Sequence, residues 1–157
     1  MIRFALALAL TTLPAAAQSV NPCGAWTRAE AIAEPWEQMS ASYADGAVRL
    51  AQIDSIEPAA ASVHLLILSP PYDEAQARQC RVVSLSRAEA GGWPAGFYAL
   101  DFPARSVTYD PAKGLEVTMP AQTSVPETGS GAPATLSVTI NQATGQITAR
   151  LTRTAGP

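Results

Sequence analysis

Apolar and polar positions alternate one by one through much of the second half of the chain. This is the period of a β-strand with one buried face. Two segments of this kind predict hairpins, one from residue 106 to 119 around Gly114 and one from residue 136 to 151 around Gly145. Both glycines can supply the positive φ that such turns need.

The middle of the chain predicts strands of a different kind. Residues 62–69 are apolar on both faces, which predicts a central strand that is covered on each side. Further candidate strands cover residues 47–53, 79–86 and 96–102. Between the two hairpins, the stretch 122–133 is rich in Ser, Thr, Gly and Pro, and it predicts a long mobile loop.

Residues 29–43 differ, because their apolar positions recur every three or four residues. Ile32, Trp36 and Met39 fall on one face at this spacing, which predicts an amphipathic helix near the N-terminus. Pro35 lies within it, and we expect the helix to kink or split there. The helix would then pack its apolar face against the sheet.

These elements together predict a mainly β fold on the border of the α+β class. We expect an antiparallel sheet of about six or seven strands, open or curled like a barrel, with the N-terminal helix on its apolar face. The order of the strands along the sequence does not choose among an open sheet, a barrel and a sandwich.

The first 17 residues have the features of a secretory signal peptide. Arg3 provides a positive start, residues 4–10 form an apolar run, and residues 15–17 are three alanines. The apolar run is shorter than the roughly 20 residues that a spanning helix needs. We expect cleavage after Ala17, which leaves residues 18–157 as one mostly β domain. The alternative is a buried N-terminal helix in a cytosolic protein.

Cys23 and Cys80 are the only cysteines, and both lie beyond the expected cleavage site. An even pair in an exported chain predicts a disulfide, here one that ties the N-terminal segment to a central strand. The alternative is a pair of redox-active thiols, but the spacing is not that of a C-x-x-C motif.

The charge balance excludes some partners. The chain has 10 basic and 13 acidic residues, and Lys113 is its only lysine. Such a mildly acidic chain lacks the basic patch that nucleic acids or anionic membranes attract. The preference for arginine and alanine suggests a bacterial source with GC-rich DNA. With an export signal and a disulfide, this points to the periplasm, with full secretion as the alternative.

Motifs for catalysis, metals or cofactors are absent from the sequence. It contains no Walker A, G-x-S-x-G, H-E-x-x-H or G-x-G-x-x-G pattern, so we expect no cofactor and no metal. His64 is the only histidine, and it lies on the predicted central strand. A hydrolase would have to use it with a carboxylate from Asp54, Asp73 or Asp101. A buried, hydrogen-bonded imidazole is the simpler interpretation.

Aromatic residues near turns suggest binding instead. Trp93 lies between Gly92 and Pro94 in a predicted loop, and loop aromatics on a β scaffold often contact ligands. Tyr72 and Tyr98 are further candidates. We therefore interpret the chain as a non-enzymatic binding or interaction module for an envelope protein or small ligand, with a small periplasmic hydrolase as the alternative.

Overall fold

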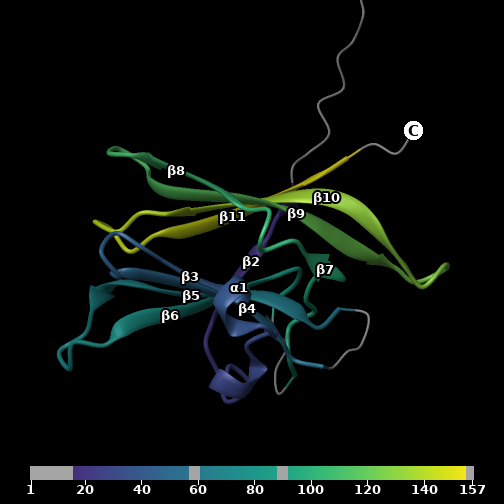
Figure 1. The fold of residues 1–157 in the computed structure, drawn as a ribbon, viewed down its shortest axis with the longest axis horizontal. Coiled ribbons are helices and arrows are strands. Elements are labelled where there is room, and N and C mark those ends of the chain that lie inside the picture. The colour runs from purple at the N-terminus through teal and green to yellow at the C-terminus, as the bar shows by residue number, and fades with distance from the viewer. Residues whose placement is uncertain (1–15, 57–60, 88–91, 155–157) are drawn as a thin grey trace, which may run out of the picture.

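The structure, a computed structural model, describes residues 16–56, 61–87 and 92–154. The predicted signal peptide therefore lies almost entirely outside the described residues. The prediction of a mainly β, antiparallel fold is confirmed. The prediction of one sheet is wrong, because the strands form two open sheets that face each other as a sandwich (Figure 1).

Sheet A contains six strands. They are β1 (Ala16–Ala17), β7 (Ala99–Leu100), β8 (Ser106–Asp110), β9 (Gly114–Val125), β10 (Ser130–Ile140) and β11 (Ile147–Arg153). Their order is β1-β11-β10-β9-β7, and β8 also pairs with β9. Both predicted hairpins are confirmed, since Val107 lies opposite Val117 and Leu136 lies opposite Leu151. Gly114 and Gly145 have the positive φ values expected of their turns.

Sheet B contains five strands. They are β2 (Ser19–Pro22), β3 (Ser40–Tyr43), β4 (Val48–Asp54), β5 (Val63–Tyr72) and β6 (Arg78–Ser84). Their order is β2-β6-β5-β4-β3, so the predicted central strand does lie in the middle of a sheet. Its two apolar faces have different neighbours. One faces sheet A, and the other faces the N-terminal segment.

The long loop predicted over residues 122–133 is instead the end of a hairpin. Residues 122–125 belong to β9 and residues 130–133 to β10, and Pro133 lies opposite Gln122 in their register. Thr is a good strand former, and the ladder continues past Pro133 on both sides. The composition of residues 122–133 therefore indicated a loop, but pairing between β9 and β10 makes most of this stretch part of sheet A.

The apolar core lies between the sheets. Its buried residues come from both layers; among them are Val48, Leu50, Leu65, Ile67 and Val83 of sheet B and Leu115, Val117, Met119, Leu136, Val138 and Ile140 of sheet A. These residues alternate with polar ones along their strands, so each strand gives one face to the core. Phe97, just before β7, and Phe102, just after it, are also fully buried.

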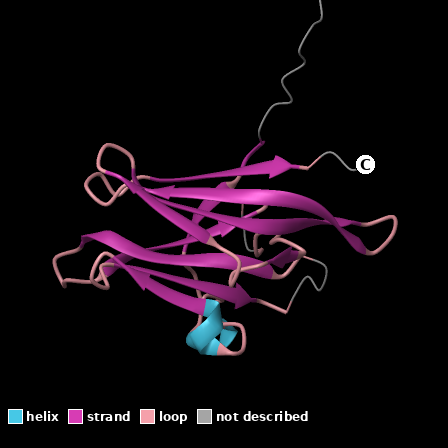
Figure 2. Cartoon of the chain, turned by 45° about the horizontal axis from the view of Figure 1, so that its top comes forward, coloured by secondary structure: helices cyan, strands magenta, loops and turns pink. Residues whose placement is uncertain are grey.

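The predicted N-terminal helix is wrong. The segment contains only a short 3-10 turn, η1 (Ala29–Ala31), and a four-residue helix, α1 (Trp36–Met39). Pro35 stops a longer helix, because it lacks a donor and disfavours helical geometry in the preceding residue. The segment lies on the outer side of sheet B (Figure 2), although Met39 at its end packs against the core between the sheets. Ile32 pairs there with Ile53, while Trp36 is 47% exposed.

We call residues 23–39 the strap, because they cross the outer face of sheet B. A second irregular segment, residues 93–100, passes from sheet B to sheet A. In it, Phe97 exchanges backbone hydrogen bonds with Val63 of β5, and the next amide, Tyr98, donates to Gln122 of β9. The aromatic strand predicted over residues 96–102 is thus mostly a crossing between sheets, with only Ala99–Leu100 as a strand.

Candidate functional site

The outer face of sheet B carries a row of buried residues that do not belong to the core. Ile53 lies opposite His64, and the register of β5 with β6 places His64 opposite Ser84. All three have 0% exposure, yet the core cluster between the sheets does not include them. They alternate with core residues along their strands, so they face outward and must be covered from outside. The strap provides that cover.

Two serine hydroxyls contact the imidazole ring of His64. The Ser84 hydroxyl lies 2.9 Å from Nδ1, and the Ser55 hydroxyl lies 3.3 Å from Nε2. The Ser55 hydroxyl donates to the Ser62 carbonyl, so it accepts from Nε2–H. Nδ1 is then free to accept from the Ser84 hydroxyl. The result is a chain of hydrogen bonds that places a neutral histidine on the strand.

Burial also favours the neutral form. It lowers the pKa of His64 from 6.5 to about 4, while the negative charge of Asp54 opposes part of that change. His64 is therefore uncharged at neutral pH. A neutral imidazole with both nitrogens hydrogen-bonded is a structural support more than a reactive base.

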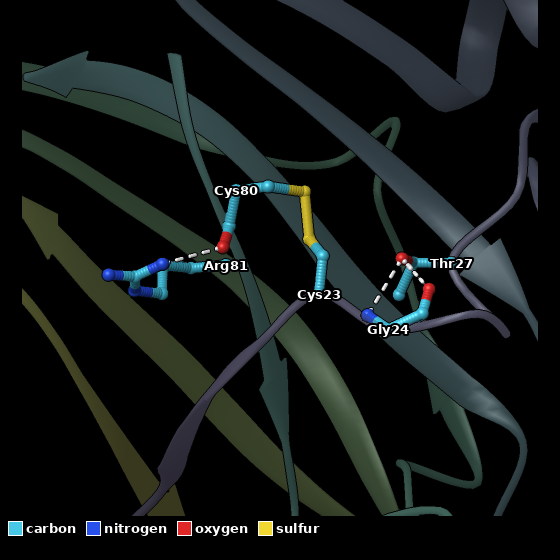
Figure 3. The surroundings of a disulfide bond; sticks show 5 residues. All are labelled: Cys23, Gly24, Thr27, Cys80 and Arg81. Carbon is cyan, nitrogen blue, oxygen red and sulfur yellow. Dashed lines mark hydrogen bonds between the residues drawn. A yellow bond between two sulfur atoms is a disulfide. The ribbon is translucent and has the colours of Figure 1, made fainter. Parts of the chain in front are cut away.

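The disulfide predicted between Cys23 and Cys80 is confirmed, and it brings the strap to the sheet (Figure 3). The Cys23 amide donates to the Cys80 carbonyl at 3.4 Å, which extends the pairing of β2 with β6. The Thr27 hydroxyl then closes a turn by donating to the Gly24 carbonyl at 2.7 Å and accepting from the Gly24 amide at 3.2 Å. This turn directs Trp26 back over the sheet.

Trp26 covers the imidazole. Its ring centre lies 5.0 Å from that of His64, with the two planes tilted by 56°. Trp26 also stacks with Trp93 at a centre-to-centre distance of 6.2 Å and an angle of 26°. Trp93 is 51% exposed. We call Trp26, Trp93 and the buried His64 beneath them the aromatic site.

The backbone beside Trp93 is tied to β6 and its end. The Leu85 amide donates to the Ala95 carbonyl at 2.9 Å, and the Ala95 amide donates to the Ser86 hydroxyl at 3.0 Å. Pro94, between Trp93 and Ala95, is buried. The exposed indole therefore projects from a short segment whose backbone is hydrogen-bonded at Ala95, through both its amide and its carbonyl.

Gly96 allows this segment to approach β5 closely. Its amide donates to the Ala61 carbonyl at 2.6 Å. A Cβ at this position would lie 2.5 Å from the Val63 carbonyl oxygen, 2.7 Å from the Ala61 carbonyl oxygen and 2.8 Å from Cε1 of His64. Two of these atoms belong to the backbone, so they cannot move without disturbing the strand.

We expect Gly96→Ala to lower the free energy of unfolding by about 1–3 kcal/mol, because the added methyl group overpacks the contact with β5. Urea unfolding followed by far-UV circular dichroism would measure the loss. The displaced segment should also shift the fluorescence of Trp93 in the folded protein. Unchanged stability together with an unchanged emission spectrum would contradict the close approach of Gly96 to β5.

The other two aromatic candidates do not join the aromatic site. Tyr72 ends β5, eight residues after His64 and roughly 25 Å along the strand, and it packs against the Arg78 guanidinium at 5.6 Å. Tyr98 begins the part of the crossing that pairs with sheet A, and its ring lies beside Gly131. Of the three residues predicted to bind, only Trp93 belongs to the aromatic site.

Of the carboxylates considered for a hydrolase, Asp54 ends β4, and Asp73 and Asp101 lie in loops. Among the described residues, the carboxylates of Asp54, Asp73 and Asp101 accept hydrogen bonds from backbone amides of their own loops. Both imidazole nitrogens of His64 are instead occupied by hydroxyl groups. The serine hydroxyl nearest to His64, that of Ser84, belongs to a residue with 0% exposure.

Sequence reasoning missed Trp26, Ser55 and Ser84. A signal for Trp26 was available, since it follows Cys23 by three residues and the disulfide anchors that cysteine to a central strand. Ser84 could be found only from the register between β5 and β6. Ser55 reaches the ring from the residue after β4, a contact that no periodicity predicts.

Within residues 16–56, 61–87 and 92–154, no group of three or more His, Cys, Asp or Glu side chains could hold a metal ion. The helices of these same residues are all too short to cross a membrane. Comparison with protein-family models, with curated proteins and with solved structures found no match to this chain.

Proposed function

We propose that this chain is an exported, non-enzymatic binding protein that contacts an envelope protein or small ligand through the aromatic site. One observation carries the proposal. Trp93 exposes half of its surface to solvent while its ring stacks on Trp26, which itself rests on a buried imidazole.

A rigid, exposed tryptophan is a favourable binding residue for physical reasons. Its ring offers a large apolar face, and few torsions must be ordered when a ligand covers it. Here the disulfide fixes Trp26, and backbone hydrogen bonds fix the segment of Trp93. Little conformational entropy would be lost on binding, which is the advantage of a preorganised site.

Export is supported by the cysteine chemistry. The two cysteines form a disulfide, and such bonds persist mainly in oxidising compartments. The apolar N-terminal run with its three alanines adds the sequence pattern of a signal peptide. We propose the periplasm as the compartment, with secretion as the alternative.

The hydrolase alternative receives less support from the geometry. A general base needs a proton acceptor with a suitable pKa and an accessible nucleophile beside it. The pKa of His64 is lowered to about 4, no described carboxylate is hydrogen-bonded to its ring, and Ser84 is buried.

The binding proposal predicts that Trp93→Ala loses the partner while Trp36→Ala keeps it. Trp36 is a matched control, because it is 47% exposed and lies on the same strap as Trp26 but outside the aromatic site. The wild-type protein and both variants would be immobilised and exposed to periplasmic extract of the source organism. Eluted proteins and small molecules would then be identified by mass spectrometry.

For the species retained by the wild type, we expect Trp93→Ala to weaken binding roughly 30-fold, as for an aromatic hot spot. Isothermal titration calorimetry with the purified partner would give this ratio. Equal retention by wild type and Trp93→Ala, or equal losses for the two tryptophan variants, would refute a role for the aromatic site.

A further inference from the structure

A second feature of the outer face of sheet B lies beside the strap. The sheet register places two rows of outward residues next to each other. One row is Ser40, Ala51 and Leu66, and the other is Ser42, Arg49 and Leu68. The strap leaves these rows partly uncovered, and with Ile32 they line a groove of about 510 Å³. We call it the β3–β5 groove.

The groove has an apolar floor and a polar, positively charged side. Its floor is apolar, formed by Ala51, Leu66 and Leu68, with Ile32 as a wall from the strap. Its outer side carries the hydroxyl groups of β3 and the guanidinium of Arg49. Among the described residues, the only salt bridge joins Arg28 and Glu30, and no hydrogen bond of the Arg49 side chain is found. The groove thus pairs an apolar floor with an uncompensated positive charge.

The dimensions of the groove argue for a small occupant. Three adjacent strands at about 4.8 Å spacing make it roughly 10 Å wide, and two rows along a strand make it roughly 7 Å long. Stable protein interfaces bury about 800 Å² on each partner, which is far more than this footprint. Its volume lies within the range of about 300–1,000 Å³ that is typical of small-molecule sites.

The position of the apolar floor also argues against a peptide strand added to β3. Such a strand would lie beyond the edge of sheet B, about three strand spacings or roughly 14 Å from Leu66 and Leu68 on β5. Its side chains would meet the serines of β3 and leave the floor uncovered. An occupant that covers the floor must lie on the face of the sheet.

We propose that the β3–β5 groove binds a free medium-chain aliphatic carboxylate. The chain would lie over Ala51, Leu66 and Leu68, and the carboxylate would pair with Arg49. This proposal is independent of the proposed function of the aromatic site, because neither Trp26 nor Trp93 lines the groove.

Octanoate is a suitable probe for the full chain. We expect it to bind, and we expect its amide chemical-shift changes in ¹⁵N-labelled protein to centre on Ile32, Leu66 and Leu68. Hexanoate should bind more weakly, with roughly twofold to fourfold lost for each methylene removed. Acetate, which lacks the chain, and octanol, which lacks the charge, should each bind more weakly than octanoate.

Variants of Arg49 test the role of the charge. Arg49 is exposed, so Arg49→Gln should fold normally, and we expect it to bind octanoate roughly twofold to fivefold more weakly. Arg49→Lys should restore most of the affinity. Arg150→Gln removes an equal charge from the outer side of sheet A and should bind like the wild type. Trp93→Ala should also bind octanoate normally, even if it abolishes the function proposed above.

Several results would overturn the proposal. They are the absence of shifts at up to about 10 mM octanoate, shifts centred away from the groove, or equal affinity for wild type and Arg49→Gln. Size-exclusion chromatography with light scattering provides a further check. A dimer that Leu68→Asn dissociates would show that a second copy of the chain covers the groove instead.

Discussion

Replacing both cysteines, as Cys23→Ala with Cys80→Ala, is expected to lower the free energy of unfolding by about 4 kcal/mol. The bridge joins residues separated by 57 positions. On chain-entropy grounds, closing a loop of this length removes that much conformational freedom from the unfolded state. Total stability of a domain of this size is about 5–15 kcal/mol, so the double variant would be marginally folded.

Urea unfolding of oxidised wild type, reduced wild type and the double variant would test this expectation. Reduction should destabilise the wild type by a similar amount and leave the double variant unchanged. The strap should also loosen over the sheet, so the emission of Trp26 is expected to change in the folded double variant. A loss below about 1 kcal/mol would show that the strap remains in place without its covalent anchor.

A second large effect is expected from pH, through His64. Its pKa is about 4 in the folded protein, against 6.5 for a solvated histidine such as that of the unfolded chain. Between these values, the unfolded chain binds a proton that the folded protein does not. Stability is therefore fully present above pH 6.5, and it falls as the pH drops toward 4. The contribution amounts to about 3 kcal/mol.

The control for this effect is His64→Gln, which keeps a polar side chain at the position but cannot titrate. Carboxylates also titrate near pH 4, so the informative quantity is the difference between the two proteins. Free energies of unfolding would be measured from about pH 7.5 to 4.5, and the wild type should lose about 3 kcal/mol more than the variant. Parallel pH profiles would mean that His64 has the same pKa in the folded protein as in the unfolded chain. His64→Asn offers a second comparison if His64→Gln folds poorly.

The sequence predicted most strands because alternation records which face of a strand is buried. It did so accurately for the last hairpin, where Val138 lies opposite Ala149 and Ile140 lies opposite Ile147. Alternation does not record which strand lies beside which. The division into two sheets depends on long-range pairing, such as that of β2 with β6, and no local pattern contains it.

The helix prediction is wrong because a proline interrupts the helical spacing of the apolar residues. Apolar residues at helical spacing do cover a surface, but Pro35 prevents a continuous helix. Individual side chains of the segment therefore cover the sheet in extended and turn conformations. Ile32 pairs with Ile53 beside β4, whereas Trp36, which was expected to pack against the sheet, is half exposed.

The sequence indicated two residues of the aromatic site, Trp93 and His64, but not Trp26. Trp93 was identified because a large apolar ring between a glycine and a proline is unusual for a core position. The interpretation of His64 as a buried, hydrogen-bonded imidazole agrees with its two serine contacts. That Trp26 connects the two residues follows only from the path of the strap, which depends on tertiary structure.

The division of strands between the sheets has a consequence for biosynthesis. All strands of sheet B lie before residue 85, and apart from β1 all strands of sheet A lie after residue 98. Because a chain is made from its N-terminus, the nascent polypeptide can contain every strand of sheet B before any of β7–β11 exists. The apolar side of that sheet then has no partner, so the early half of the chain is the part that a chaperone would need to shield until synthesis ends.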